Sequence, residues 1–290
     1  MLVIKLNKAT TDTSIAVLKD DALLDNDSGG VRFLFDLAPA VWTSGANPAN
    51  GNAIQDLAEQ SNGSFVLRSG QSVTYAGGGF DFGAITDDES YISIPASVAA
   101  SIWGNGSDNQ YFLACLYVKL PISSNWNINA VLAPFLQFNN NVNGYQSGPD
   151  LITIAQKSGG VLSFRRQTDG TTGNIERTIV VPAGDYGQFA QIACWRTATE
   201  YRGRLRTAAN TTLSTSAATG ANNTGNFSTQ AGQAGIGKGL WTPATTADHR
   251  SAAKFRLHRG FIENLNLSGR DPQTVLDADW TRVVARQAFS

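Results

Sequence analysis

The stretch GQAGIGKGLW, residues 232–241, carries the residue types of a phosphate-binding loop. It reads G-x-x-x-x-G-K, and the full motif continues with Ser or Thr, whose hydroxyl group ligates Mg²⁺. Here that position is Gly239. The polar sequence before the stretch and Pro243 after it disfavour the strand and helix that such a loop must connect. We therefore interpret it as a glycine-rich strand and turn, and expect no nucleotide or other cofactor.

Few residues are suited to metal binding or nucleophilic catalysis. The chain has two cysteines, Cys115 and Cys194, and two histidines, His249 and His258. Zinc sites draw on closely spaced pairs of such residues, which these four do not form. Both cysteines lie in apolar segments, where a thiol is inert. We predict no metal site, and surface or hydrogen-bonded roles for the histidines.

The acidic cluster Asp87-Asp88-Glu89 falls in a predicted loop. Adjacent residues of a turn rarely converge on one bond, as the carboxylate pair of a glycosidase must. We interpret the cluster as a solvated turn, with contact to a cation or sugar as the alternative. We thus expect no catalytic residues and no enzymatic activity, and a glycoside hydrolase with an unrecognised carboxylate pair is the remaining enzymatic alternative.

Three arginines, Arg202, Arg204 and Arg206, alternate along a predicted strand and would lie on one face of it. Nucleic-acid sites usually add a net positive field and stacking aromatic residues, whereas the formal net charge here is -1. We predict a solvated or partner-facing strand and no nucleic-acid partner.

Three aromatic residues, Trp126, Tyr145 and Trp241, lie in loop-like segments and could stack on sugar rings. The alternative is that a tryptophan closes one end of a β-sandwich, because tryptophan is usually largely buried. They are the candidate carbohydrate contacts.

Composition limits the partners further. Of the 290 residues, 42% are hydrophobic and only 16% are charged, below the usual quarter. A surface rich in Asn, Gly, Ser and Thr suits broad contacts with protein or sugar. No run of about 18 apolar residues exists, so we expect no membrane span. We also expect no signal peptide, because the first residues lack a long apolar core and a cleavage site.

Strand patterns dominate the chain. Residues 111–120 alternate, and residues 151–156 and 161–167 are joined by the turn sequence KSGG. Further strands are expected at 177–184, 189–196, 200–208 and 254–262. Many short strands separated by Gly/Asn turns are typical of an all-β fold, a two-sheet antiparallel sandwich.

Helical patterns are fewer. Residues 96–103 follow Pro95, and residues 271–287 begin with Asp271 as a cap and Pro272 in the first turn. Residues 52–60 could form one or two helical turns. The Asn/Thr/Ser-rich segment 207–230 is predicted to be a long surface excursion. We therefore divide the chain into an N-terminal arm and linker (1–28), a sandwich domain (29–270) and a C-terminal helical tail (271–290).

Several motifs together resemble the concanavalin A-like, or laminin-G-like, jelly rolls. In order along the chain they are VRFLFDLA, the NGNAIQDL loop, GGGFDFGAITDDESYISIPAS, YFLACLYVKL, FAQIACWRTAT, AGIGKG and KFRLHRGFIENLNLSG. The resemblance covers roughly residues 30–270 and implies a jelly-roll sandwich. The glycosidase branch carries E-x-D-x-x-E on one strand, and neither that motif nor the pentraxin calcium motif is found here.

Pentraxins have the same sandwich and carry a disulfide between neighbouring strands, at F-T-V-C-L-x-F and H-I-C-T-x-W. FLACLYV and QIACWRT place Cys115 and Cys194 at matching positions, so the resemblance implies that the two are adjacent. Whether they are bonded depends on the compartment and the geometry, and a buried free pair is the alternative.

The arm, the uncharged polar surface and the C-terminal helix are similar in style to tailed-bacteriophage structural proteins. We expect a non-enzymatic virion protein of a tail, fibre, collar, baseplate or capsid decoration, assembled in the host bacterial cytoplasm. Its partners would be other virion proteins and copies of itself in a homo-oligomer. The alternative is a carbohydrate-binding adhesin that recognises a host surface glycan, and both can hold for a receptor-binding tail protein.

Overall fold

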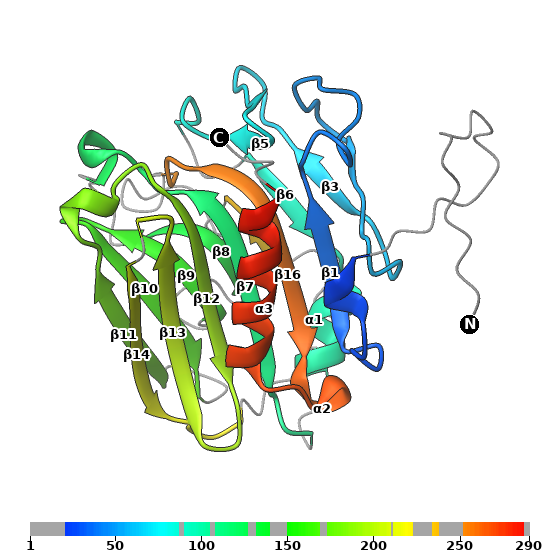
Figure 1. The fold of residues 1–290 in the computed structure, drawn as a ribbon, viewed down its shortest axis with the longest axis vertical. Coiled ribbons are helices and arrows are strands. Elements are labelled where there is room, and N and C mark those ends of the chain that lie inside the picture. The colour runs from blue at the N-terminus through cyan, green and yellow to red at the C-terminus, as the bar shows by residue number, and fades with distance from the viewer. Residues whose placement is uncertain are drawn as a thin grey trace.

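The computed structural model describes residues 21–86, 90–104, 108–126, 132–139, 150–168, 173–209, 211–222, 234–237 and 252–286. In this part of the chain, two antiparallel sheets pack face to face and a helix near the C-terminus lies over one of them (Figure 1). The predicted two-sheet antiparallel sandwich with a short C-terminal helix is confirmed. Among the described helices, none is long and apolar enough to cross a membrane.

The first sheet, sheet A, is built around a long strand near the C-terminus. In spatial order it contains β14 (Thr212–Ala218), β13 (Glu200–Thr207), β12 (Phe189–Arg196), β7 (Phe112–Lys119), β16 (Arg256–Asn264), β5 (Gly79–Asp81) and β4 (Thr74–Ala76), while β1 (Val31–Asp36) also pairs with β16. One edge of β16 pairs with β7 along its whole length, and the other edge is shared by β5 and β1.

The second sheet, sheet B, has the order β11 (Asn174–Val180), β10 (Val161–Gln167), β9 (Asp150–Lys157), β8 (Ala133–Asn139), β15 (Ala234–Ile236), β6 (Tyr91–Ile94), β3 (Gly63–Val66) and β2 (Ala53–Ile54). The glycine-rich stretch that resembles a phosphate-binding loop contributes β15, which lies between β8 and β6. The helical elements are η1 (Ala22–Leu24), α1 (Ala96–Trp103), η2 (Ser123–Trp126), η3 (Ala183–Asp185), α2 (Leu265–Ser268) and α3 (Pro272–Ala285).

Successive side chains along each strand point to opposite faces of the sheet, and those on the inner faces form the core between the two sheets. On β7, Phe112, Ala114, Leu116 and Val118 join the main core, as the pattern predicted. The intervening residues, such as Leu113 and Tyr117, are also buried, but in a second apolar cluster on the outer face of sheet A. Helix α3 covers that face, so β7 is buried on both sides.

Helix α3 has the local signals that sequence predicted. The Asp271 carboxylate accepts hydrogen bonds from the Thr274 amide (2.8 Å) and hydroxyl (2.8 Å), which satisfies a free donor of the first turn. Pro272 occupies the first turn, where a missing N–H is tolerated. The Trp280 ring stacks on Tyr117 with centroids 6.3 Å apart, and so ties the helix to β7.

Two local predictions were wrong. Residues 52–60 form β2 and then turns, because the buried Asp56 carboxylate accepts hydrogen bonds from the amides of Leu34, Ala58, Gln60 and Ser61. These bonds favour a tight turn over a helix. Within the expected surface excursion, residues 212–218 form β14, which pairs with β13.

The end of the expected linker is packed on the sandwich. Leu23 in η1 is buried in the outer apolar cluster, and Asp21 contacts β16. Residues 1–20 of the expected arm and linker lie outside the described residues. Asp21 and Leu23, near the end of the expected linker, thus contact the sandwich.

A buried arginine joins four segments. Arg259 on β16 is 1% exposed, and its guanidinium contacts carboxylates of Asp21 (2.6 Å), Asp36 (3.0 Å) and Asp279 (3.1 Å). Arg286 adds a contact to Asp36 (2.8 Å). Burial would lower the pKa of Arg259, but the three carboxylates outweigh burial and raise that pKa. Arg282 also contacts Asp279, at 3.4 Å. We refer to Arg259, its three aspartates, Arg282 and Arg286 as the Arg259 cluster.

We expect Arg259→Leu to lower the free energy of unfolding by about 3–5 kcal/mol, because it leaves buried carboxylates without their cation. Denaturant unfolding monitored by tryptophan fluorescence would measure the change. Lys157→Ala is the control, since the Lys157–Glu176 pair is about a third exposed and is worth about 0–1 kcal/mol. Equal effects of the two substitutions would contradict a structural role for the cluster.

Candidate functional site

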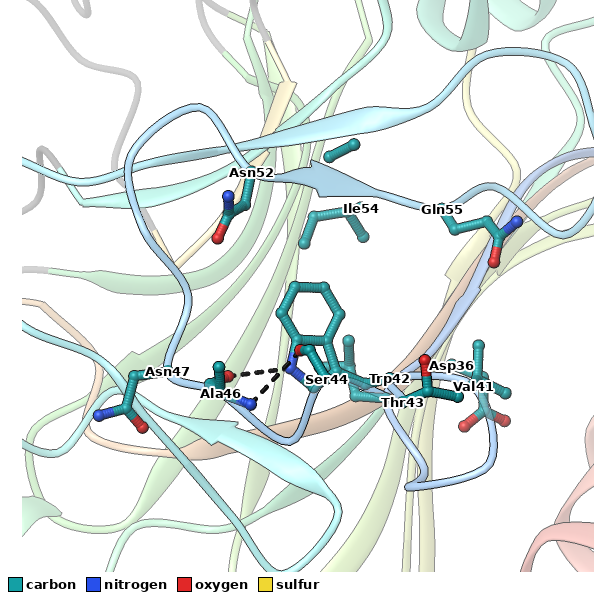
Figure 2. Close-up of a pocket in the computed structure, with 12 residues that line it drawn as sticks. Asp36, Val41, Trp42, Thr43, Ser44, Ala46, Asn47, Asn52, Ile54 and Gln55 are labelled. Atoms are coloured by element: carbon teal, nitrogen blue, oxygen red, sulfur yellow. Dashed lines mark hydrogen bonds between the residues drawn. The ribbon is translucent and has the colours of Figure 1, made fainter. Parts of the chain in front are cut away.

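A cleft of about 450 Å³ opens beside the edge strands β2 and β4. One wall is the loop 41–47, which follows β1, and the other is β2 with its neighbours Asn52 and Gln55 (Figure 2). We call it the Trp42 cleft, because the indole of Trp42 stands between these walls.

The Trp42 indole is half-buried and firmly held. Its Nε1 donates to the carbonyl oxygen of Ala46 at 2.9 Å. Its ring meets Phe80 edge to face, with centroids 5.0 Å apart at 87°, and lies 6.4 Å from the Tyr75 ring. Phe80 belongs to the main core, so the indole is an extension of the core into the cleft.

The segment 41–52, which includes both walls at one end of the cleft, is held by asparagine side chains. Asn47 accepts a hydrogen bond from the Tyr75 amide (2.8 Å), Asn50 from the Leu67 amide (3.0 Å) and Asn52 from the Ala49 amide (2.7 Å). Side chains that bind backbone amides in this way replace the pairing that a strand would supply. This segment is thereby attached to both sheets. Leu67 directly follows β3 of sheet B, and Tyr75 lies on β4 of sheet A.

Asp36 is the one ionisable side chain in the lining of the cleft. Its Oδ1 accepts from the Ala38 amide (2.9 Å), and its Oδ2 accepts from Arg259 and Arg286. Burial raises the pKa of Tyr75, and the Asp36 charge adds to that increase. The Asp36 carboxylate is therefore engaged in structural hydrogen bonds through both of its oxygens.

The remaining lining is uncharged. It contains the amides Asn47, Asn52 and Gln55 and the hydroxyl groups of Thr43 and Ser44, beside apolar Ile54 and Val41. An aromatic wall with amide and hydroxyl groups suits a sugar ring, which has apolar faces and a rim of hydroxyl groups. Within the described residues, no group of three or more His, Cys, Asp or Glu side chains is placed to hold a metal ion.

The candidate carbohydrate contacts do not form this cleft. Trp126 is only 2% exposed, and its Nε1 donates to the Pro121 carbonyl at 2.9 Å. It packs on Tyr186 and so fills the core, which leaves no face for a sugar. Tyr145 and Trp241 lie outside the described residues, as do Asp87, Asp88, Glu89 and His249.

The two cysteines lie on neighbouring strands but are not bonded. Both are free and buried. In the β7–β12 register, Cys115 opposes Ala193 and Cys194 opposes Ala114. This offset of one residue points the two side chains to opposite faces of sheet A. Burial raises the pKa of Cys194 to about 12 and also raises that of Cys115, so neither is an activated thiolate.

The arginine stripe meets a partner within the same chain. Arg204 and Arg206 contact the Asp277 carboxylate of α3 at 2.5 Å and 3.0 Å. Arg206 also lies over the Trp280 ring, 5.0 Å from its centroid. Arg202 pairs with Glu200 at 2.7 Å. The predicted alternation is present, and helix α3 covers part of the stripe.

Trp42, which lines the cleft, was not among the candidate site residues predicted from the sequence. The only signal was the run WTSGANPANGN, in which an aromatic residue precedes several asparagines and glycines in a loop. The exposure of Trp42 and the burial of Trp126 are decided by distant parts of the chain.

No family model matches this chain, and no curated protein matches it. Among solved structures, it is similar to the binding domain of Paraclostridial Mosquitocidal Protein 1, with 13% identity and a TM-score of 0.43 over 82% of this chain and 49% of that one. It thus spans about half the length of that domain.

Two phage proteins are similar at the same low level. The CBM2 module of the evolved Dit of Lactobacillus casei BL23 phage J-1 is 12% identical, with a TM-score of 0.35 over 68% of this chain and 80% of that one. The enzymatically active domain of tailspike protein 2 of bacteriophage CBA120 is 13% identical, with a TM-score of 0.35 over 59% and 26%. Likeness at this level carries no argument about function.

His258 gives a pH dependence that can be tested. It is the bulged residue of β16, 1% exposed, and its Nδ1–H donates to the Gly78 carbonyl at 3.1 Å. Burial lowers its pKa from 6.5 to about 4, with smaller effects of Arg256 and Lys119. Below pH 6.5 the unfolded chain therefore binds a proton that the folded chain refuses until about pH 4.

We expect the free energy of unfolding to fall by up to about 3 kcal/mol as the pH drops through this interval. In His258→Asn, whose side-chain amide can still donate to Gly78, this decrease should be smaller. Denaturant unfolding at several pH values would measure both slopes. Parallel slopes for the two proteins would show that His258 is not the group responsible.

Proposed function

We propose that this protein is a non-enzymatic component of a tailed-phage particle, and that its Trp42 cleft binds a sugar of a host surface glycan. The observation that carries the binding role is the Trp42 indole, held against Phe80 and flanked by uncharged amide and hydroxyl groups. Rigid aromatic rings supply contact area at low entropy cost, and fixed polar groups supply orientation.

The lining of the cleft supports binding without bond cleavage. Glycosidases use two carboxyl groups on either side of the scissile bond, about 5–9.5 Å apart. Among the residues that line this cleft, Asp36 is the one carboxylate, and two arginines occupy its Oδ2. A sugar held here would meet neither a free acid nor a free base.

The particle assignment is supported by the sequence. The jelly-roll motifs in order, the uncharged polar composition and the resemblance in style to tailed-phage structural proteins favour a subunit that packs against other virion proteins or against copies of itself.

Trp42→Ala should weaken glycan binding about ten- to hundredfold, because it removes a stacking surface worth about 1.5–3 kcal/mol. Binding of the full chain to an array of host-derived polysaccharides would measure this. Val180→Ala is the control, since Val180 is 68% exposed and outside the cleft.

Unchanged binding by Trp42→Ala, or no glycan bound by the unaltered protein, would contradict the role of the cleft. Release of reducing sugar would contradict the non-enzymatic assignment.

Immunogold labelling of particles purified from the source tests the particle assignment separately. We expect label on the particle, and label at the tail tip or fibres if the protein contacts the host. Particles without label would remove the virion assignment, while leaving the glycan-binding result intact.

A further inference from the structure

We propose that the Trp42 cleft selects an uncharged pyranose, and that Asn47 and Asn52 are the hydrogen-bond donors that orient it. This inference rests on the proposed function, because it names the class of sugar for the same cleft. It follows from the orientation of two amides and from the distribution of charge around the cleft.

The backbone determines which atom each amide presents. The Tyr75 amide donates to Oδ1 of Asn47 at 2.8 Å, and the Ala49 amide donates to Oδ1 of Asn52 at 2.7 Å. A backbone N–H only donates, so the atom that it contacts must be the carbonyl oxygen and not Nδ2. Both amides are therefore oriented, and neither Nδ2 group has a partner among the described residues.

The side chains of Asn47 and Asn52 lie at the same end of the cleft. Asn47 and Asn52 both line it and lie on opposite walls, while Gln55 lies toward the other end (Figure 2). Ser44 Oγ accepts a hydrogen bond from the Ala46 amide at 3.3 Å, so its own hydrogen also remains available as a donor. The hydroxyl and ring oxygens of a pyranose are matching acceptors.

The charge around the cleft disfavours an acidic sugar. No lysine, arginine or histidine lines it, and Asp36 is the one charged side chain that does. Carboxylates and phosphates are normally bound through charge-assisted hydrogen bonds from arginine or lysine. An acidic sugar would lose hydration in the cleft without gaining a cation, because the two arginines nearest Asp36 already bind its carboxylate, whereas an uncharged sugar avoids this penalty.

A second cleft shows the contrast. About 300 Å³ in volume, it is lined by Lys119, Lys254, Arg256 and one acid, Asp81. It has the basic side chains that the Trp42 cleft lacks. Binding of acidic sugars at that second cleft would persist in Trp42→Ala and decrease in Lys119→Ala, so the two clefts can be told apart.

Exchange of an amide for a carboxylate tests the donors without removing the contacts that hold the loop. In Asn47→Asp and Asn52→Asp the Oδ1 acceptor remains for the backbone amide, and the Nδ2 donor becomes an acceptor. Asn50→Asp is the matched control, because Asn50 makes the same kind of bond, to the Leu67 amide, but does not line the cleft. Thermal unfolding of all three would show whether the loop is retained.

The probes are neutral oligosaccharides based on galactose or N-acetylglucosamine, and acidic ones that carry sialic acid or glucuronate. We expect the full chain to bind a neutral probe at least tenfold more tightly than its acidic counterpart. Asn47→Asp and Asn52→Asp should each lose at least tenfold in that binding, while Asn50→Asp should bind like the unaltered protein.

Tighter binding of acidic probes that is lost in Trp42→Ala would overturn this inference and leave the glycan-binding function standing. Equal behaviour of Asn47→Asp, Asn52→Asp and Asn50→Asp would overturn the assignment of the donors. No binding of any probe, together with no binding on the polysaccharide array, would count against the proposed function itself.

Discussion

The buried guanidinium of Arg259 is the interaction on which the arrangement of sheet A depends. A charge at 1% exposure is tolerated only when opposite charges and hydrogen bonds replace its water. Its carboxylate partners come from η1, β1 and α3, which lie far apart in the sequence. The charge of Arg259 on β16 is therefore compensated only when η1, β1 and α3 are all in place around it.

Asp36 extends that constraint to the cleft. Its carboxylate is shared between Arg259 and Arg286 on one side and the Ala38 amide on the other, where the chain leaves β1 and enters the loop. The turn after β1 is thus held by the same charges that hold α3. Because those charges are balanced within the cluster, the cleft beside them has little net charge. This balance makes an uncharged ligand the better fit.

The Trp42 cleft combines a rigid base with a loop that carries few regular backbone bonds. The rings of Phe80 and Tyr75 pack against the indole. Asn47 and Asn50 attach the segment 41–52 to backbone amides of neighbouring segments, and Asn52 accepts from an amide within it. Binding residues on loops held by a rigid scaffold are a common arrangement in β-sandwiches. At the opposite edges of the two sheets, Arg177 on β11 donates to the Ser216 carbonyl of β14 at 2.9 Å and so joins the two edge strands.

Local patterns in the sequence were enough to predict many elements. The alternation in residues 111–120 predicted β7 and its inner face, and the Asp271 cap with Pro272 predicted α3, because spacing and capping act within a few residues. Tertiary structure decided the rest. Whether Trp42 or Trp126 is exposed depends on Phe80 and Tyr186, which are distant in sequence. The resemblance indicated that Cys115 and Cys194 are neighbours, yet one residue of register sets them on opposite faces. Register, burial and charge pairing arise only when distant segments meet, so short-range spacing cannot encode them.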